Sequence, residues 1–402
     1  MKEKKILFLT TTNLAANPRL TKELWLATAN GFDATVLQFT LGNWSDEKTE
    51  ALEKEFTDVN FIRLSALRKP FLPWLISSIL EWFFRMLPYG TMPTLWLSVA
   101  VSKRTYLLLK EVKKMKSSFR WVVAHNPGAF YPAQVAAKQT GAFLGIDVED
   151  YHPGETTDKR ASMRMKELMQ RVLPAADYCS FAAPLIKEKF SKELTDLPVS
   201  QLVILNGFEQ SDFLMPADLQ QQPLKCVWFS QFIDKGRGLE PVLPVISSLH
   251  PDVELHLVGN LKEAFRDQFI QSQQGIVVHD SMKQKDLHRF LEKFDVGLAL
   301  EPGRDVNNQL ALSNKMMAFA QAGLFILATN TPAQDQFLAE SKWESKQTDL
   351  SPAHLKEVLL QLIQQKEQIR MNRHQRFAKG KLYNWEKISL PLVHEWEKKR
   401  LN

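Results

Sequence analysis

Lys315 occupies a position that disfavours a cation unless an anionic partner is close by. Residues 313–322 have the pattern of a helix that ends before Gly323, which places Lys315 in the first turn. Unpaired N–H groups and the positive end of the helix dipole repel a positive charge there. A phosphate bound between Lys315 and the helix would remove this conflict. An ion pair with Glu301 or Asp305, or a side chain that points into water, would also remove it, and the sequence leaves these alternatives open.

Residues 230–238 (SQFIDKGRG) form a second cationic loop, between a predicted strand and a predicted helix. Lys235 and Arg237 supply positive charge, and Gly236 lets a ligand approach the backbone closely. This composition is typical of loops that bind phosphate at the start of a helix. The spacing is neither that of a P-loop nor that of the GxGxxG dinucleotide motif. The loop therefore indicates a phosphate site without identifying the nucleotide.

Residues 147–155 (DVEDYHPGE) place four carboxylates and a histidine directly after a predicted buried strand. Glu149, Asp150 and His152 are candidates for a general base or for a group that orients a substrate hydroxyl. The alternative is that these charges cap the next helix.

A polar loop at residues 13–19 follows the first predicted strand. Asn17 and Arg19 in this loop are candidates to hold an anion at the carboxyl edge of the sheet. A solvent-facing arginine is the alternative for Arg19.

Strand and helix patterns alternate along most of the chain, which predicts parallel sheets with right-handed crossovers. The predicted strands are residues 5–10, 34–39, 121–125, 143–148, 178–182 and 202–205, followed by 226–230, 255–258, 276–278, 296–300 and 325–328. Helices are predicted between them, including residues 19–30, 128–140, 160–173 and 184–192, and two long helices at 352–373 and 385–399 end the chain.

These patterns predict an α/β protein with two doubly wound, Rossmann-like domains that face a cleft. The first covers residues 1–208, residues 209–223 have the composition of a linker, and residues 224–383 form the second domain. Residues 384–402 form a C-terminal helix. Folds of this kind bind ligands at the carboxyl ends of their strands, where all the loops above are expected to lie.

Residues 63–120 interrupt the alternation. They are rich in aromatic side chains and leucine, and they contain eleven basic but only two acidic residues. No apolar run reaches the length of a membrane span. Docking to an anionic lipid surface fits this composition. A buried helical pair with solvated lysines is the alternative.

Bulk properties exclude several classes of protein. A net charge of +6 on 402 residues is too small to predict nucleic-acid binding. Cys179 and Cys226 lie in apolar runs without the spacing of a metal site, so we expect buried free thiols in a reducing compartment. The apolar run at the N-terminus is too short for a signal peptide. The sequence predicts a cytoplasmic protein, with peripheral attachment to the inner membrane face left open.

The order and spacing of several segments resemble the retaining glycosyltransferases of the GT-B fold, of the group-1 or family-4 type. The segments are NPRLTKE, DVEDYHPGE, ILNGFE, DKGRGLE, LHLVGN, EPGRDVNNQLALSNKMMAFAQAGLFILATNTPAQ and YNWEKI. The resemblance covers nearly the whole chain and implies that its last helix returns to the first domain.

The resemblance also implies roles for individual residues. Lys235 would contact the diphosphate of the donor with help from Arg237, beside Gly236. The helix start at Ser313, Asn314 and Lys315 would lie against the sugar nucleotide, and His279, Asp280 and Ser281 would lie near the base. Glu301 matches the first glutamate of the family's E-x7-E motif. The candidate catalytic residues are therefore Glu149, Asp150, His152, Lys235 and Glu301.

Three positions depart from the family pattern. Ser230-Gln231-Phe232 replaces a segment that usually contains an arginine. The second glutamate, which holds the nucleotide ribose in the family, falls at Ala318, and the residue eight positions after Glu301 is Gln309. An inactive or partner-dependent member of the family is therefore an alternative.

The implied reaction transfers a sugar from a nucleotide-diphosphate donor to an acceptor hydroxyl, with retention and with no metal or cofactor beyond the nucleotide sugar. The implied acceptor is a glycan or a lipid-linked precursor of a cell-surface polysaccharide or glycolipid. The rival readings are a sugar-nucleotide epimerase or phosphorylase of the same architecture, and a non-catalytic subunit that binds nucleotide sugar.

Overall fold

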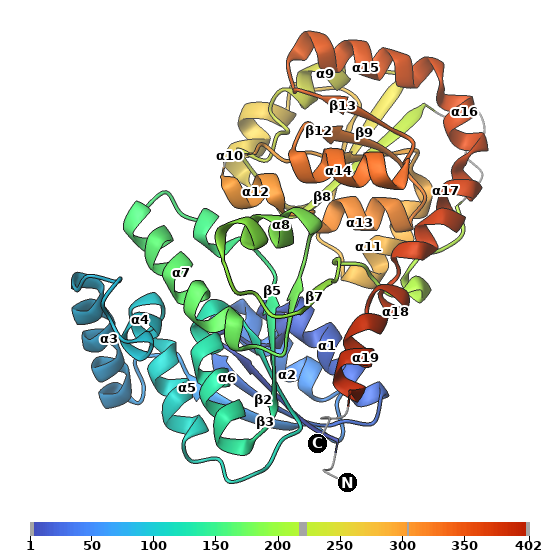
Figure 1. The fold of residues 1–402 in the computed structure, drawn as a ribbon. Coiled ribbons are helices and arrows are strands. Elements are labelled where there is room, and N and C mark those ends of the chain that lie inside the picture. Colours follow the sequence, from blue (N-terminus) through green and yellow to red (C-terminus); the bar gives the residue numbers. More distant parts are fainter. Residues whose placement is uncertain (1–3, 217–222, 304, 399–402) are drawn as a thin grey trace. The chain divides into compact units, whose positions relative to one another are not determined.

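The structure is a computed structural model that describes residues 4–216, 223–303 and 305–398. The chain divides into two compact units (Figure 1). Unit 1 comprises Met1–Ile204 together with Ser389–Asn402, and unit 2 comprises Leu205–Ile388. Each unit is built on its own parallel sheet, which confirms the predicted α/β class.

Unit 1 contains a seven-stranded sheet in the order β3-β2-β1-β4-β5-β6-β7, with every pair parallel. The strands are β1 (Lys5–Thr10), β2 (Asp33–Thr40), β3 (Asn60–Ser65), β4 (Trp121–His125), β5 (Phe143–Val148), β6 (Tyr178–Phe181) and β7 (Ser200–Val203). The helices are α1 (Pro18–Ala29), α2 (Trp44–Glu53), α3 (Phe71–Met86), α4 (Thr94–Val101), α5 (Arg104–Val112), α6 (Pro127–Thr140), α7 (Lys159–Val172) and α8 (Pro184–Glu193). The strand order reverses between β1 and β4, and such a switch point is where doubly wound sheets bind ligands.

The last helix of the described chain, α19 (Leu390–Glu397), belongs to unit 1 although unit 2 lies between them in the sequence. Trp396 anchors it and is fully buried. Its backbone oxygen accepts a hydrogen bond from Trp121 Nε1 at 2.9 Å, and its own Nε1 donates to Tyr178 Oη at 3.0 Å. The apolar side of this short helix therefore packs into the hydrophobic core of the first domain.

Unit 2 contains a six-stranded parallel sheet in the order β10-β9-β8-β11-β12-β13. The strands are β8 (Leu224–Ile233), β9 (Val253–Leu261), β10 (Ile276–His279), β11 (Val296–Ala299), β12 (Phe325–Thr329) and β13 (Ser345–Thr348). The helices are α9 (Val242–Ser248), α10 (Glu263–Phe265), α11 (Gln284–Phe290), α12 (Val306–Leu310), α13 (Asn314–Gln321), α14 (Pro332–Ser341), α15 (Pro352–Gln364), α16 (Lys366–Met371), α17 (Arg373–Gly380) and α18 (Trp385–Ile388). Here the order reverses between β8 and β11.

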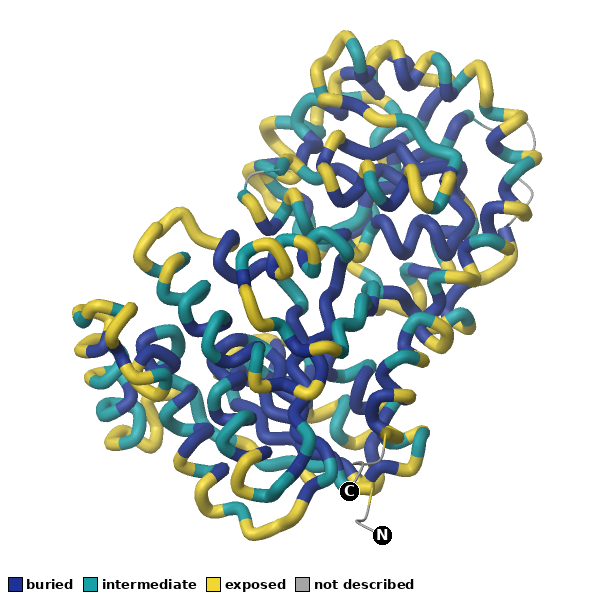
Figure 2. The backbone as a smooth tube through the Cα atoms, viewed as in Figure 1, coloured by how far each residue is buried: buried dark blue, intermediate teal, exposed yellow. Residues whose placement is uncertain are grey.

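Burial follows the pattern expected for parallel sheets (Figure 2). The central strands are dark blue in both units, whereas the outer helices alternate between buried and exposed residues. In unit 2 the core consists of side chains from β8, β9, β11 and β12 packed against α9 and α15. Sheets buried on both faces require continuous apolar runs, which is why the strands were visible in the sequence.

Several local predictions were wrong. No helix was predicted between residues 300 and 313, but this segment contains the short helix α12, which Asp305 caps. The long helix predicted at 352–373 is divided among α15, α16 and α17. β8 continues to Ile233, so residues 230–232 belong to a strand with an irregular register rather than to a loop. Within the described ranges, every helix is too short or too polar to cross a lipid bilayer.

Candidate functional site

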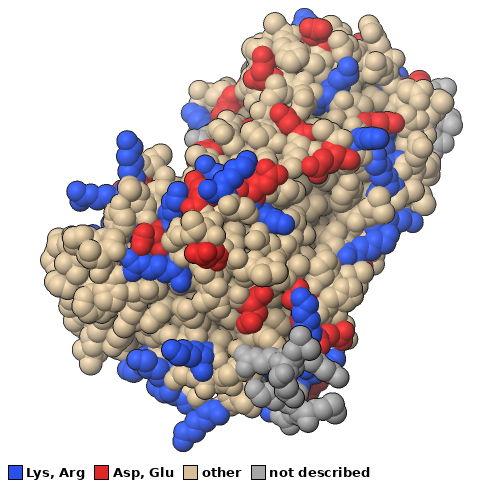
Figure 3. Space-filling view, in the orientation of Figure 1, with Lys and Arg blue, Asp and Glu red and all other residues tan. Residues whose placement is uncertain are grey.

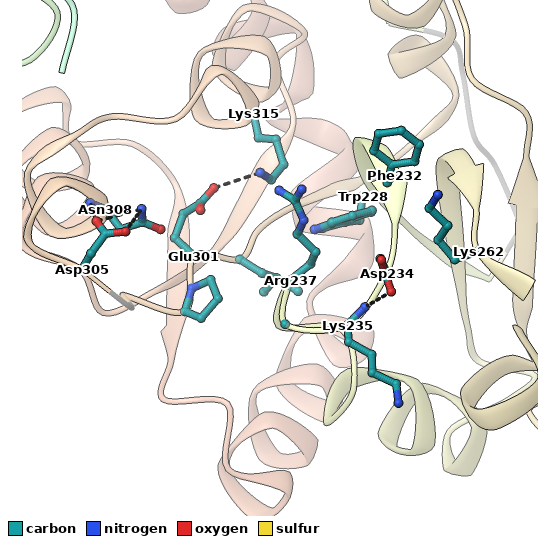
Figure 4. A pocket seen from close by; sticks show the side chains of 13 residues that line it. Trp228, Phe232, Asp234, Lys235, Arg237, Lys262, Glu301, Asp305, Asn308 and Lys315 are labelled. Atoms are coloured by element: carbon teal, nitrogen blue, oxygen red, sulfur yellow. Dashed lines mark hydrogen bonds and ion pairs between the residues drawn. The ribbon is translucent and has the colours of Figure 1, made fainter. Parts of the chain in front are cut away.

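The cationic loop and the start of α13 meet at a cavity of about 390 Å³ in unit 2 (Figure 4). The residues that line it are Trp228, Phe232, Asp234, Lys235, Gly236, Arg237, Lys262, Leu300, Glu301, Pro302, Asp305, Asn308 and Lys315. They lie in the second half of β8 or beyond the carboxyl ends of β8, β9 and β11, at the point where the strand order reverses. A ligand site at this edge is what the topology of a doubly wound sheet favours.

The loop after β8 turns tightly into the cavity. Gly236 and Gly238 have φ values of +73° and +79°, which side chains with a Cβ rarely adopt. The Asp234 carboxylate accepts a hydrogen bond from the Lys235 N–H at 2.7 Å, and the Glu240 carboxylate accepts one from the Gly236 N–H. These two contacts hold the turn at both ends. The helix predicted to open directly at this loop begins later, with α9 at Val242.

Arg237, rather than Lys235, points into the cavity. Figure 4 shows the Arg237 guanidinium between Trp228 and the Lys315 side chain. The Lys235 side chain points away from both, with Nζ 5.6 Å from the centre of the Phe269 ring. Both residues line the cavity, but the Arg237 side chain is better placed than that of Lys235 to reach a ligand in it.

Lys315 forms an ion pair with Glu301, with 2.9 Å between Nζ and Oε1. The pair is mostly buried, and Thr329 fixes the Glu301 backbone by accepting from its N–H and donating to its carbonyl oxygen, each at 2.9 Å. Glu301 thus resolves the charge conflict at the start of α13, which was one of the alternatives left open. The Lys315 ammonium still faces the cavity and lies 5.9 Å from the centre of the Trp228 ring.

The cavity has more free positive than free negative charge. Among the described residues, Lys235, Arg237 and Lys262 form no ion pair with a carboxylate. Of the three lining carboxylates, Glu301 is paired with Lys315, Asp234 accepts from the Lys235 N–H, and Asp305 accepts from the N–H and side-chain amide of Asn308 at the start of α12. An anion that enters the cavity therefore meets cations whose charge is not already neutralised, which favours its binding.

The other residues predicted for donor binding do not line this cavity. His279 ends β10, where its Nε2 lies 2.9 Å from His256 Nδ1 and the two rings stack, and Asp280 and Ser281 follow it. Ser313 is the N-cap residue of α13, but its side chain forms no capping hydrogen bond, and Asn314 is exposed.

Ala318 is fully buried within α13. The position to which the resemblance assigns a ribose-binding glutamate therefore faces the core of unit 2 rather than the cavity.

In unit 1, Glu149 and Asn126 form a polar network at the switch point between β1 and β4. Asn126 Nδ2 donates to Glu149 Oε1 at 2.6 Å, while Asn126 Oδ1 accepts from Thr10 Oγ1 at 2.6 Å and from Thr12 Oγ1 at 3.3 Å. Burial, together with the charge of Asp147, raises the pKa of Glu149 to about 7. A carboxyl group with such a pKa near a substrate hydroxyl is suited to proton transfer at neutral pH.

His152 is buried beside this network, and its Nδ1 lies 2.8 Å from Glu155 Oε2. Burial opposes its positive charge, but Glu155 outweighs burial and raises the pKa of His152. Its Nε2 is buried and has no hydrogen-bond partner among the described atoms. Asp150 is partly buried. The acidic loop therefore places Glu149 and His152 at the carboxyl edge of the sheet, whereas Glu155 holds the histidine in place.

Arg19 and Asn17 do not lie in an open, anion-accessible loop as the sequence had predicted. Arg19 is neither solvent-facing nor open to an anion, because it is buried on α1 and its Nε donates to Asp147 Oδ2 at 2.7 Å. Asn17 is also buried and caps α1 by accepting from the Leu20 N–H at 2.9 Å. Both side chains are occupied by hydrogen bonds within the first domain.

Asp147 belongs to a buried group of charges with Arg19, Glu23 and His125. The His125 nitrogens lie 3.3 Å from Glu23 Oε2 and 3.3 Å from Asp147 Oδ2, and Ser180 Oγ donates to Asp147 Oδ1 at 2.6 Å. Burial opposes the charge on His125, but the two carboxylates outweigh it and raise the pKa of His125 to about 10.

The ligand atoms of Glu23, His125 and Asp147 lie within 4.8 Å of one another, close enough to share a metal ion. The Arg19 guanidinium already contacts Asp147, however, and an added cation would be repelled by it. Two carboxylates with two cations form a balanced ion-pair cluster, so we interpret this group as structural.

Sequence reasoning missed Trp228, Phe232 and Lys262. Trp228 and Phe232 lie in β8, and aromatic residues in a predicted strand are normally interpreted as part of the hydrophobic core. Lys262 directly follows β9, and its Nζ lies 4.5 Å from the centre of the Phe232 ring. A cation immediately after a central strand was a usable signal, but the predicted end of that strand at residue 258 hid it.

No protein-family model and no curated protein sequence matches this chain. Solved structures do match along its full length. HepE from Anabaena, in complex with UDP, has a TM-score of 0.64 at 13% sequence identity, over 97% of this chain and 99% of HepE. Sucrose-phosphate synthase from Thermosynechococcus elongatus has a TM-score of 0.65 at 12% identity, with 98% of each chain covered. The fold is the GT-B fold.

A third match is a protein from Listeria monocytogenes assigned as a UDP-N-acetylglucosamine 2-epimerase. It has a TM-score of 0.58 at 15% identity, over 100% of this chain and 98% of its own. At such identities the likeness establishes the architecture, and the activity has to be argued from the site.

Proposed function

We propose that this protein is a glycosyltransferase that takes a sugar from a nucleotide-diphosphate donor. The observation that carries the proposal is the cavity at the switch point of unit 2, where Arg237, Lys235 and Lys262 have no carboxylate partner among the described residues. A diphosphate is the common biological anion whose charge and size suit a cavity lined by several cations. The GT-B fold supports this choice, since HepE, of the same fold, was solved with UDP and glucose.

In the proposed reaction, the bond between the anomeric carbon of the sugar and the diphosphate oxygen breaks. A bond forms from that carbon to an acceptor hydroxyl oxygen, with retention of configuration, and the hydroxyl proton leaves to a base. Negative charge develops on the departing diphosphate, and Arg237 and Lys315 are placed to stabilise it. We propose that these protein cations supply the charge stabilisation without a metal ion.

Glu301 has two roles in this proposal. It holds Lys315 in position through their 2.9 Å ion pair, and its carboxylate lines the same cavity as Arg237. When a diphosphate binds, Lys315 exchanges part of its contact with Glu301 for contact with phosphate. The released carboxylate then becomes free to accept hydrogen bonds from sugar hydroxyls.

On the acceptor side we propose Glu149 as the proton acceptor, because its pKa of about 7 leaves it partly ionised at neutral pH. Asn126 orients it through the 2.6 Å hydrogen bond. The acceptor class that we propose is a glycan or a lipid-linked precursor, used on the cytoplasmic side of a membrane.

A sugar-nucleotide epimerase is the second candidate, since the Listeria protein assigned to that activity shares the fold over the whole chain. The two functions differ in their need for an acceptor. An epimerase changes the donor sugar without a second substrate, whereas a transferase releases nucleoside diphosphate in proportion to glycosylated acceptor. A binding subunit without activity would bind the nucleotide and release nothing.

The first experiment is calorimetric titration of the full chain with UDP, GDP, TDP, ADP and CDP, each compared with its nucleoside. Binding of at least one diphosphate, and much weaker binding of the matching nucleoside, is the expected result. Products from the corresponding nucleotide sugars are then identified by mass spectrometry with and without added glycan or lipid-linked acceptors. Failure of every diphosphate to bind would exclude the transferase and the epimerase together.

A further inference from the structure

Helix α3 in unit 1 presents its apolar side chains to solvent. Leu72, Trp82 and Met86 are 64%, 61% and 65% exposed, and Phe71, Ile79 and Phe83 are also exposed. Residues 72, 79, 82, 83 and 86 recur at the spacing of a single helix face. Soluble proteins rarely expose an apolar surface of this size unless it contacts a partner.

Three polar side chains of α3 lie on the side of the helix opposite the apolar face. Ser77 is only 1% exposed, and Glu81 and Arg85 follow it at intervals of four residues. Glu81 accepts from the Lys103 N–H at 3.0 Å and pairs with Arg85 at 3.1 Å, while Arg85 Nε donates to the Ala100 carbonyl oxygen at 3.0 Å. The helix is therefore fixed to α4 by its polar side, and the apolar side is left without a partner.

Phe84 completes this anchorage, because its ring is buried and stacks on Trp96 of α4 with 5.3 Å between the ring centres. The outward orientation of Trp82 and Phe83 thus follows from contacts on the opposite side of the helix. In Figure 3, the left edge of the molecule, where Figure 1 places α3, is almost entirely free of charged residues.

Exposed cations lie at the N-terminal end of this apolar face. Arg68 and Lys103 approach the Trp74 ring to 5.2 Å and 5.3 Å from its centre, and Lys69 is exposed just before the helix begins. The carboxylate of Glu81 is already occupied by its contacts with Arg85 and Lys103. Exposed tryptophan and phenylalanine beside arginine and lysine match the chemistry of an anionic lipid interface.

We propose that the exposed face of α3 docks on an anionic lipid surface, with Trp82 and Phe83 inserted among the lipid headgroups and Arg68 and Lys69 in contact with lipid phosphates. A second copy of this chain fits the charges less well. A two-fold dimer would place this face against itself, so the interface would hold Arg68 and Lys69 of both copies while the Glu81 carboxylates are already occupied by other contacts. The alternative of a buried helical pair does not hold for α3, because its apolar face is exposed.

The test is flotation of the full chain with vesicles of phosphatidylcholine alone and with vesicles that also contain phosphatidylglycerol. We expect binding to the mixed vesicles, at least about tenfold weaker binding to the neutral ones, and weakening by added salt. Equal binding to both vesicles, or binding to neither, would overturn the proposal.

Two variants locate the surface. Trp82→Ser combined with Phe83→Ser should weaken binding to the mixed vesicles by at least about tenfold, because the side chains that insert are removed. Trp44→Ser is the matched control, since Trp44 is an exposed tryptophan on α2 of the same unit. Arg68→Gln combined with Lys69→Gln should also weaken binding, by about tenfold. Wild-type binding by the Trp82/Phe83 variant would refute the assignment of this face.

Sedimentation velocity without lipid tests whether a second copy of this chain covers the exposed face of α3. We expect a monomer at all concentrations. A dimer that Trp82→Ser with Phe83→Ser abolishes would show that a second copy covers this face, and the lipid proposal would fall. Docking deepens the proposed function but is measured separately, because the patch variants should retain nucleotide binding in calorimetry. A protein that binds nucleotide but not lipid would contradict only the docking proposal, whereas one that binds lipid but not nucleotide would contradict only the proposed function.

Discussion

Replacement of Arg237 by glutamine should weaken binding of the nucleoside diphosphate while the nucleoside itself binds as before. Arg237 points into the cavity and has no carboxylate partner among the described residues, so a phosphate contact costs no existing ion pair. A hydrogen bond to a charged group contributes about 1.5–3 kcal/mol. Because Arg237 is exposed and screened by water, we take the lower end, which corresponds to about tenfold in Kd.

The assay is calorimetric titration at low and high salt, with Arg289→Gln as the matched control. Arg289 is an exposed arginine on α11 of the same unit and does not line the cavity. The effect of Arg237→Gln should shrink as salt rises, and the control should match the wild type in both conditions.

Lys235→Gln provides the sharper comparison, because the Lys235 side chain points away from Arg237 and Lys315. Its effect should be smaller than that of Arg237→Gln. If Lys235→Gln weakens binding more than Arg237→Gln does, the orientation of this loop in the ligand-bound protein differs from the one described, and the reasoning fails.

Three further predictions concern the buried ion-pair cluster around Asp147, the proposed base Glu149, and the ion pair between Glu301 and Lys315. Asp147→Asn should lower the free energy of unfolding by about 3–5 kcal/mol, because it leaves a buried cation uncompensated. Asp33→Asn, which removes an exposed ion pair with Lys5, should cost less than about 0.5 kcal/mol; urea denaturation measures both, and equal effects would contradict the cluster. The rate of transfer should rise with pH through about 7 as Glu149 loses its proton, and Glu149→Gln should remove that rise; an unchanged pH profile would exclude Glu149 as the base. Glu301→Gln should bind diphosphate about threefold to tenfold more tightly, since Lys315 is no longer neutralised, and weaker binding in calorimetry would refute the proposed exchange of partners.

Sequence reasoning identified the ligand edge of unit 2 because its elements have strong local signals. Parallel strands buried on both faces read as continuous apolar runs, and the glycines after β8 mark a turn that only they adopt easily. Lys315 was recognised as a cation in an unfavourable position from helix physics alone. Which partner relieves it was not decided there, because Glu301 lies fourteen residues away in the chain and reaches Lys315 only through the sheet.

For the apolar segment before β4, residues 63–120, the sequence likewise identified the composition but not the contacts. Its composition indicated either a lipid-facing surface or a buried helical pair. The outcome depends on which side of α3 packs on α4, and the contacts of Glu81, Arg85 and Phe84 set that orientation.

The sequence by itself determined the two α/β sheets, the positions of their turns and the types of charged residue at their edges, since each depends on short-range patterns. Only the tertiary structure decided which charges remain free. Arg19 looked available in the sequence, but Asp147 neutralises it in the core at 2.7 Å, although 128 residues separate the two. Arg237 and Lys262 come from the ends of adjacent strands and line one cavity without a carboxylate partner among the described residues. Charge pairing depends on distance in space, which a residue's neighbours in the chain do not specify.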